Sequence, residues 1–347
     1  MMTIRGVFLA AIAIATTHVV PALAQDKTIY VAGSGGSMEK AIRSDVFPAF
    51  AAKHGVKLEY VAGNSTDVLA KLQAQKGSQQ IDVAIIDDGP MAQAVALGFC
   101  RPLDLGPVVN DLYDIARFPD GKSLAFALLG AGFVYSKDAF TRNNWPAPTS
   151  WNDLSDPKFK GKIVIPPLNN TYGVISLVQV AKANGGGETN IEPGFAAFKN
   201  KIGPNVLAYE PSPGKMTELL QSGQAALAVW GSSRAKALAD SGFASDFVYP
   251  KEGGVVIGVG ICPVAGGKES PEAQAFIAHL LSPEMQVAMS KTSGLAPVNK
   301  KADLPPEYRA GMPYGPEQVA QLKTIDWVEI NRQRDEWNKR WVREIER

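Results

Sequence analysis

Short apolar runs alternate with amphipathic stretches along most of the chain. The run "IDVAIID" at 81–87 is almost continuously apolar, which is typical of a parallel strand covered on both faces. In the stretch that begins near Ser37, the residues Met38, Ala41 and Ile42 fall on one face of a helix. Regular alternation of these two patterns predicts an α/β protein.

Strands are expected in the apolar runs at 28–33, 56–63, 81–87, 161–167, 205–212, 225–230 and 255–265. Helices are expected in the amphipathic stretches at 37–54, 65–75, 89–98, 171–183, 213–223, 232–242, 270–282, 283–294 and 326–346. We expect Pro48 to break or kink the first helix, and Ser65 or Thr66 to cap the second. The last helix has an apolar stripe, and its charges should therefore face solvent. That stripe consists of Ile330, Trp337, Trp341 and Ile345.

The N-terminus has the layout of a secretory signal peptide. Arg5 precedes an apolar run that ends in Ala22-Leu23-Ala24, which is an A-x-A cleavage pattern. The run is too short to span a bilayer comfortably, and no later stretch is long and apolar enough to do so. We therefore expect cleavage after Ala24 and a soluble mature protein outside the cytoplasm.

Composition and charge narrow the possible partners. The chain has 347 residues, of which 46% are hydrophobic and 20% are charged, and its net charge is +1. This balance provides no field that would attract nucleic acid or an anionic membrane. The length allows two domains, and three scattered histidines make a metal site unexpected. Cys100 and Cys262 either form a disulfide in an oxidising compartment or remain free, and the sequence leaves both open.

Parallel sheets in two halves of one chain predict two lobes with a cleft between them. Ligands bind such folds at the carboxyl ends of the strands. The loop "GSGGS" at 33–37 is in that position, but it lacks the glycine-lysine-hydroxyl unit of a P-loop and the third glycine of a dinucleotide fingerprint. It is either a simple turn or a cradle for a ligand's polar end, and we favour the cradle. The cradle residues are Ser34, Gly35, Gly36 and Ser37.

Other candidate residues occupy equivalent loops. Ser65 opens the second helix, and the adjacent Asp87 and Asp88 follow the third strand. Neighbouring carboxylates in a strand point apart, so at most one of the two faces the cleft. That carboxylate either accepts a hydrogen bond from a ligand ammonium or only caps the following helix. The second half of the chain adds an aromatic residue for stacking and a guanidinium for an anion. Its candidates are Thr171, Tyr172, Trp230, Gly231, Ser232 and Arg234.

The sequence contains little that indicates catalysis. It contains no G-x-S-x-G elbow and no H-E-x-x-H motif, and His54 and His279 lie in helical patterns far from the candidate loops. An exported hydrolase of a small amide or ester, using Asp87 or Asp88 with Glu210, is the alternative of another class. We expect a binding protein with no enzymatic activity, no cofactor and no metal.

Longer stretches carry a family resemblance. The stretch "PTSWNDLSDPKFKGKIVIPP" is similar to a signature of periplasmic solute-binding proteins of ABC importers, in particular the spermidine/putrescine-binding type and its iron- and thiamine-binding relatives. Further similar stretches follow in family order over nearly the whole mature chain. They are "GSGGSMEKAIRSDVFPAF", "IDVAIIDDGPMAQAVALGFCRPLD", "GFVYSKDAF", "LLQSGQAALAVWGSS", "YPKEGG" and "SGLAPVNK".

The resemblance implies the two-lobed α/β fold of periplasmic binding proteins, the venus-flytrap fold. Each lobe would be a mainly parallel sheet flanked by helices, with two crossings near 124–133 and 249–260. Lobe one would comprise 25–128 and 254–314, lobe two 129–253, and a helical tail at 315–347 would pack on the lobes. Cys100 and Cys262 would fall in the same lobe, which favours a disulfide between them.

The resemblance also implies a function. A periplasmic, monomeric protein of this type binds a small solute by hinge closure and delivers it to a membrane permease, and a sensory module would share its fold. Polyamine binders of the family cage a dication with several acids, whereas "NNTYG" and "VVIGVGIC" carry no acid here. A mixed pocket favours a small zwitterion such as an amino acid, a GABA-like compound or an aminophosphonate, and polyamine binding is the alternative.

Overall fold

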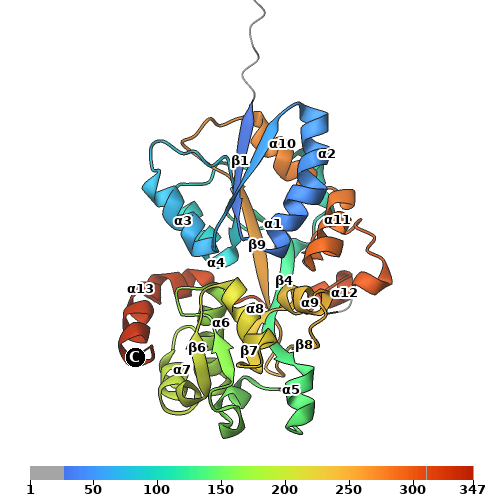
Figure 1. Ribbon diagram of the computed structural model, residues 1–347. Coiled ribbons are helices and arrows are strands. Elements are labelled where there is room, and N and C mark those ends of the chain that lie inside the picture. The colour runs from blue at the N-terminus through green and yellow to red at the C-terminus, as the bar shows by residue number, and fades with distance from the viewer. Residues whose placement is uncertain (1–26, 310, 347) are drawn as a thin grey trace, which may run out of the picture.

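A central sheet runs through both halves of the molecule (Figure 1). The computed structural model describes residues 27–309 and 311–346, so the predicted signal peptide and its cleavage site lie outside the described residues. The strands are β1 Thr28–Gly33, β2 Lys57–Ala62, β3 Val83–Asp87, β4 Leu124–Ser136, β5 Ile163–Ile165, β6 Val206–Tyr209, β7 Leu227–Gly231, β8 Ser245–Val248, β9 Val255–Pro263 and β10 Ala296–Pro297.

The helices cover both faces of this sheet. They are α1 Ser37–Ala41, α2 Phe47–His54, α3 Ser65–Ala74, α4 Asp88–Ala96, α5 Lys137–Arg142, α6 Thr171–Ala183, α7 Glu192–Ala197, α8 Pro213–Gln221, α9 Ser232–Asp240, α10 Pro271–Leu280, α11 Pro283–Ser293, α12 Pro316–Ala320 and α13 Trp327–Glu344. The strands and helices predicted from the apolar runs and amphipathic stretches are confirmed. Those patterns missed the long strand β4, where only the family resemblance indicated a crossing, and shorter elements such as β8, α5 and α12. None of the helices in the described part of the chain is long and apolar enough to span a membrane.

Two long strands, β4 and β9, join the halves of the molecule. The strand order is β2-β1-β3-β9-β4-β7-β5-β6, so β9 pairs with the upper half and β4 with the lower half in Figure 1. Each half contains a parallel set, β2-β1-β3 above and β7-β5-β6 below. The crossing strands are antiparallel to each other and to their neighbours. The predicted α/β fold is therefore confirmed, while the exact limits of the two lobes stay predictions.

The strand of the second crossing, β9, begins at Val255, as the apolar run at 255–265 predicts. Residues 251–254 form a turn that ends in Gly253 and Gly254, and the strand starts at Val255. Gly254 allows the ring of Tyr249 to lie against the backbone, because a Cβ there would stand 2.7 Å from that ring. The turn therefore takes up the first residues of the segment that was expected to cross.

The helix predicted over 37–54 contains a π-helical turn. Residues Ile42–Val46 form this turn between α1 and α2, immediately before Pro48. Pro48 has no N–H to donate to the preceding turn, so the backbone widens there and then continues as a regular helix. The expected kink is thus realised as a π turn, and the helix does not break.

Cys100 and Cys262 form a disulfide within the upper half. Cys262 lies on β9, and Cys100 follows α4 and pairs with Val264 in an isolated bridge. Both cysteines are buried in an apolar cluster that includes Met91. The bond therefore ties the end of α4 to a crossing strand and does not bridge the two halves.

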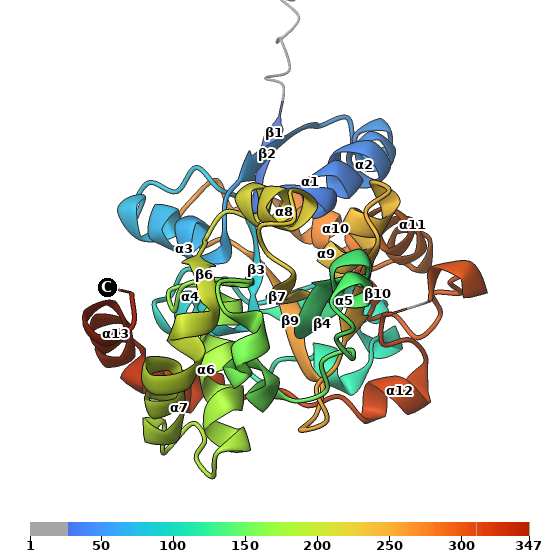
Figure 2. The same ribbon diagram turned by 60° about the horizontal axis from the view of Figure 1, so that its bottom comes forward.

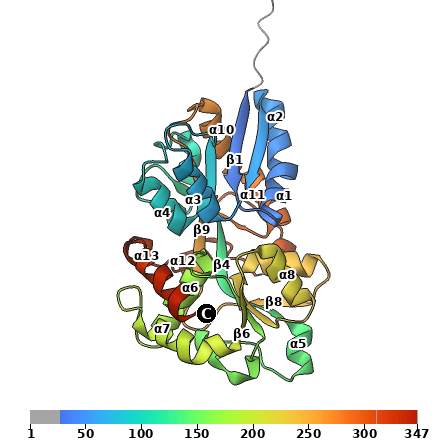
Figure 3. The same ribbon diagram turned by 60° about the vertical axis from the view of Figure 1, so that its left-hand side comes forward.

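The C-terminal helix α13 lies over the lower half and beneath α4 (Figure 3). Its predicted apolar stripe is confirmed, because Ile330, Trp337 and Trp341 are buried and Ile345 is half-buried. Trp341 packs against Phe198 and Phe195 of the lower half. The helix is thus anchored by its apolar face and exposes most of its charges, but Arg334 is buried, contrary to the expectation that the charges face solvent.

Candidate functional site

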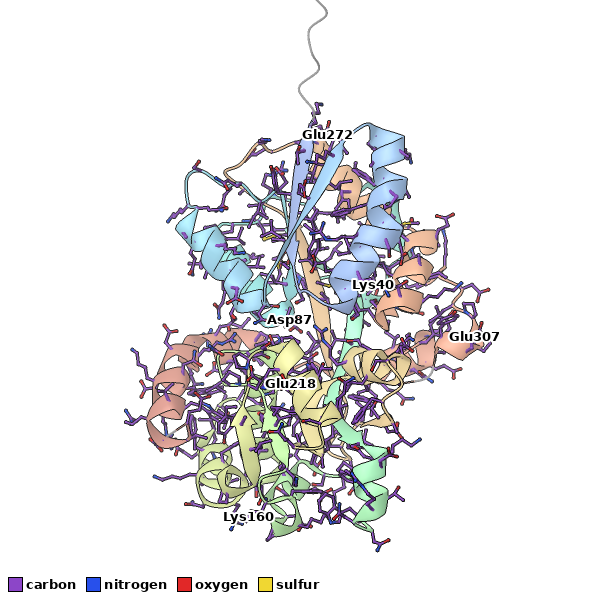
Figure 4. The ribbon with its side chains drawn as sticks, in the orientation of Figure 1. Lys40, Asp87, Lys160, Glu218, Glu272 and Glu307 are labelled. Atoms are coloured by element: carbon purple, nitrogen blue, oxygen red, sulfur yellow. A yellow bond between two sulfur atoms is a disulfide. The ribbon has the colours of Figure 1, made fainter. Side chains whose placement is uncertain are left out.

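A cavity of about 70 Å³ lies where the two halves meet. Asp87, at the carboxyl end of β3, faces the lower half at this junction (Figure 4). The upper half contributes Ser34, Ser37 and Ser65 to the lining, and the lower half contributes Thr171, Tyr172, Trp230 and Arg234. One water needs roughly 10–15 Å³, so this volume suits a small solute.

The loop after β1 approaches the neighbouring strands closely. A Cβ on Gly33 would stand 2.6 Å from the hydroxyl of Tyr60, which itself donates to the Ser34 carbonyl at 2.8 Å. Only a glycine permits this contact, and it holds Ser34 and Ser37 at the cavity. Gly35 and Gly36 line a groove outside the cavity. Of the four predicted cradle residues, the two serines therefore line the cavity and the two glycines lie outside it.

The outer groove lies between the start of α1 and α8, which are neighbours in Figures 1 and 2. Arg234 lines both this groove and the cavity. Its Nη1 atom would stand 2.7 Å from a Cβ placed on Gly36. The guanidinium on α9 therefore reaches from the lower half to the loop of the upper half, across the junction.

Gly36 provides a first test of this contact. Its φ is 76° and its ψ −133°, a region that only glycine adopts without strain. Gly36→Ala is expected to lower the free energy of unfolding by roughly 1–3 kcal/mol, and to weaken solute binding by displacing Arg234. Chemical denaturation and titration with a solute measure the two effects. Gly35→Ala is the matched control, since its Cβ would meet no atom closer than 3.6 Å, and equal effects of both variants would contradict the argument.

Asp87 occupies the position before α4 but does not cap that helix. Its backbone N–H donates to the hydroxyl of Ser65 at 3.1 Å, which fixes the end of β3 against the start of α3. Burial raises the pKa of the Asp87 carboxyl, while the hydroxyls of Thr171 and Ser65 and the charge of Arg234 lower it. The carboxylate at the cavity thus lies among two hydroxyls and a guanidinium that favour its charged form.

The cap of α3 differs from the expected one. The helix begins at Ser65, so Asn64 takes the cap position, and its N–H donates to the carboxylate of Asp67 at 3.2 Å. The prediction that Ser65 or Thr66 caps the helix was therefore wrong. The Ser65 hydroxyl accepts from Asp87 instead, which brings it to the cavity.

Asp88 points away from the cavity. Its carboxylate accepts from the backbone N–H groups of Gly89 at 2.9 Å and Gly258 at 3.2 Å. Burial and the neighbouring charge of Asp87 raise the pKa of Asp88 to about 7. Of the two adjacent acids, the structure therefore places Asp87 at the cavity and Asp88 in a supporting position behind it.

The lower half presents the start of α6 to the cavity. Asn170 caps this helix by accepting from the Tyr172 N–H at 3.0 Å. The Thr171 hydroxyl is buried and faces the carboxylate of Asp87, whose pKa it lowers. The start of α6 and the end of β3 therefore meet at the cavity.

Gly231 and Ser232 support the site from outside it. A Cβ on Gly231 would stand 2.3 Å from the Tyr172 hydroxyl, so the glycine leaves space for that ring. The Ser232 hydroxyl accepts from the Gly130 N–H at 3.2 Å. Neither lines the cavity. Trp230 does, and the Arg234 guanidinium lies 5.8 Å from the centre of its ring.

Some lining residues were missed by the sequence patterns. They are Met38, Asn64, Thr66, Leu129, Pro166, Asn170, Pro211, Pro213, Met216, Ser233, Val259 and Leu295. Asn64 and Asn170 immediately precede predicted helices, so the same loop rule would have found them. Leu129 and Val259 lie on the crossing strands, and nothing local distinguishes them from other core positions.

The residues of the hydrolase alternative are dispersed. His54 and His279 both pack against Phe50 on the far side of α2. Glu210 accepts from the Ser212 N–H at 2.7 Å in a turn. None of these side chains lines the cavity, so the described residues bring no nucleophile and base together there.

Comparison with known families gives one match over most of the chain. The model of the family described as bacterial extracellular solute-binding protein matches residues 45–313. A solved ABC transporter structure from Clostridium perfringens is similar at 26% identity, with a TM-score of 0.73, over 91% of this chain and 99% of that one. The family match therefore covers parts of both halves and begins after the loop that contains Ser34 and Ser37.

Curated relatives differ in what their names say. A probable ABC transporter periplasmic-binding protein of Sinorhizobium fredii is 26% identical over 96% of this chain and 90% of its own length. A putative 2-aminoethylphosphonate-binding periplasmic protein of Salmonella typhimurium is 26% identical over 75% of this chain and 74% of its own length. An iron uptake protein of Synechocystis is 21% identical, and the match spans 41% of this chain and 39% of that relative's length.

Proposed function

Because the chain belongs to the bacterial extracellular solute-binding protein family, whose members bind solutes and are not enzymes, we propose that it is the substrate-binding component of an ABC importer. It captures a small zwitterion that carries an ammonium and an anionic group. It works in the periplasm as a monomer and delivers the solute to a membrane permease. The predicted cleavage after Ala24 is part of this proposal.

One observation carries the choice of solute. Asp87 from the upper half and Arg234 from the lower half line the same small cavity. A zwitterion satisfies both charges at once and thereby touches both halves. A ligand stabilises the closed state only by the contacts it makes there and not in the open state. The relative named for 2-aminoethylphosphonate supports this solute class.

The polyamine alternative is less well supported. A long dication needs several acids, but among the lining residues Asp87 is the only acid and it shares the cavity with Arg234. A cation adds to the charge of the guanidinium, whereas an anionic group offsets it. We therefore favour a solute with an anionic end, and the spermidine/putrescine type stays the alternative. A sensory role, in which closure signals to a membrane receptor, would use the same site.

Calorimetry of the mature chain tests the proposal. The probes are 2-aminoethylphosphonate, γ-aminobutyrate and putrescine, each titrated into protein freed of bound solute by denaturation and refolding. At least one zwitterion is expected to bind, and at 100 times its Kd it would add about 2.7 kcal/mol to the free energy of unfolding. Tight binding of putrescine with no binding of either zwitterion would overturn the proposal, and so would chemical conversion of a bound probe.

A further inference from the structure

Arg334, on the C-terminal helix α13, is buried although it does not line the cavity. Its side chain is 5% exposed. Its Nη2 atom donates to the carbonyl of Asn169 at 3.1 Å, in the turn that leads into α6. The next two residues, Asn170 and Thr171, line the cavity. A positive charge from the tail of the chain thus lies directly behind the site.

The same helix also contacts the upper half near Asp87. Asn331 donates to the Gly89 carbonyl at 3.1 Å and accepts from Gln93 at 2.8 Å, and both of these belong to α4. The ring of Trp327 lies so close to Gly89 that a Cβ there would be 2.5 Å away. The helix therefore holds Arg334 between the starts of α4 and α6, the two helices that present charges and hydroxyls to the solute.

No carboxylate of the described residues lies within ion-pair distance of Arg334. Burial lowers the pKa of its guanidinium, and the charges of Asp87 and Asp335 raise it. A buried guanidinium with a single carbonyl partner destabilises the fold unless a negative charge lies nearby. Asp87 provides such a charge.

The charges around the cavity sum to a small positive value. Asp87 contributes −1, and Arg234 and Arg334 contribute +1 each. Asp88, whose carboxylate is bonded to two backbone N–H groups, has a pKa raised to about 7 and is only partly ionised at neutral pH. An ammonium on Asp87 cancels that acid and leaves the two guanidinium charges for the anionic end.

We propose that Arg334 is a specificity-determining residue that makes the cavity prefer a solute with one ammonium and a doubly charged anionic group, such as a phosphonate or a phosphate monoester, over one with a singly charged group. This inference rests on the proposed function and narrows it. The anionic end lies at the start of α6, where the positive end of the helix dipole adds to the attraction.

A pair of matched probes tests this preference. 2-Aminoethylphosphonate and 2-aminoethylsulfonate share one carbon skeleton and a tetrahedral anionic group, but the first carries up to two negative charges and the second one. The ratio of their dissociation constants measures the preference for the second charge. In the wild-type protein we expect the phosphonate to bind at least tenfold more tightly at pH 8.

Variants of Arg334 separate charge from shape. Arg334→Gln is expected to reduce the ratio by roughly tenfold, because one of two opposing charges is lost, and Arg334→Lys is expected to restore most of it. Arg332→Gln, on the exposed face of the same helix, is the control and should leave the ratio unchanged. Equal weakening of both probes in Arg334→Gln would indicate that Arg334 only positions the 169–171 turn, and would overturn the proposal.

A pH profile of the wild-type protein tests the preference for a doubly charged group even if Arg334→Gln fails to fold, and the same profile of Arg334→Lys tests the role of the side chain. The second proton of a phosphate-type group leaves near pH 6, so the ratio should rise between pH 5 and pH 8. The groups facing the site are Asp87, Asp88, Arg234 and Arg334 with its neighbour Asp335. Ionisation of Asp88, whose pKa is raised to about 7, adds a negative charge over the same range and opposes this rise, because it disfavours the doubly charged probe more than the singly charged one. A ratio near one at every pH would overturn this inference and leave the proposed function standing, whereas failure of every zwitterion to bind would overturn both.

Discussion

Replacing Asp87 with Asn is expected to weaken binding of a zwitterion such as 2-aminoethylphosphonate by roughly 30-fold to several thousandfold. The loss of one partner in a buried pair of charges costs about 2–5 kcal/mol, and each 1.4 kcal/mol is tenfold in affinity. Asp87 is the only acid among the lining residues of the cavity, so no neighbour replaces it. Calorimetry of the two proteins with the same probe measures the effect.

The stability of the solute-free protein should move in the opposite direction. Burial raises the pKa of Asp87, so its ionised form destabilises the fold as pH rises above the ordinary range of a carboxyl group. Asp87→Asn removes that destabilisation, so its melting temperature at pH 8 should equal or exceed that of the wild type, with a smaller difference near pH 4. Glu218→Gln, an exposed acid-to-amide change on α8, is the control. Binding by Asp87→Asn within threefold of the wild type would contradict the assigned role.

Removing the disulfide by Cys100→Ala with Cys262→Ala is expected to lower the free energy of unfolding by about 2–5 kcal/mol. The two cysteines are 162 positions apart, so the bond restricts a long segment of the unfolded chain, which gives a large effect in the loop-entropy account. Urea denaturation measures the difference. A reductant should lower the midpoint of the wild type and leave that of the double variant unchanged.

Solute binding should survive this double change. The disulfide joins α4 to β9 within the upper half and does not cross the cavity. The affinity of the wild type and the double variant for the same probe should therefore agree within a few fold. An identical midpoint with and without reductant would show that the bond does not contribute to stability.

Much of the candidate site follows from one rule about strand ends. Ser34, Ser65, Asp87, Thr171 and Trp230 all come where a predicted strand ends or the next helix begins, and the structure brings them to one cavity. Local pattern suffices here because a parallel strand followed by a helix always presents its loop at the same edge of the sheet. The rule selects loops, however, and it does not say which side chains of a loop point inward.

That second choice depends on packing. Asp87 and Asp88 are equivalent in the sequence, and only the backbone N–H groups of Gly89 and Gly258 turn Asp88 away from the cavity. Gly35 and Gly36 belong to the same loop as the two lining serines, yet they lie in the outer groove, where Arg234 reaches across to Gly36.

The order of most strands and helices along the chain, the apolar face of α13 and the positions of the loops were determined by the sequence alone. Each depends on residues a few positions apart, whose spacing sets which face of a helix or strand is buried. The pairing of Cys100 with Cys262 and the position of Arg334 behind Asp87 were decided only by the tertiary structure. These contacts join segments that are far apart along the chain, and no local spacing of charges or apolar residues encodes which distant segments meet.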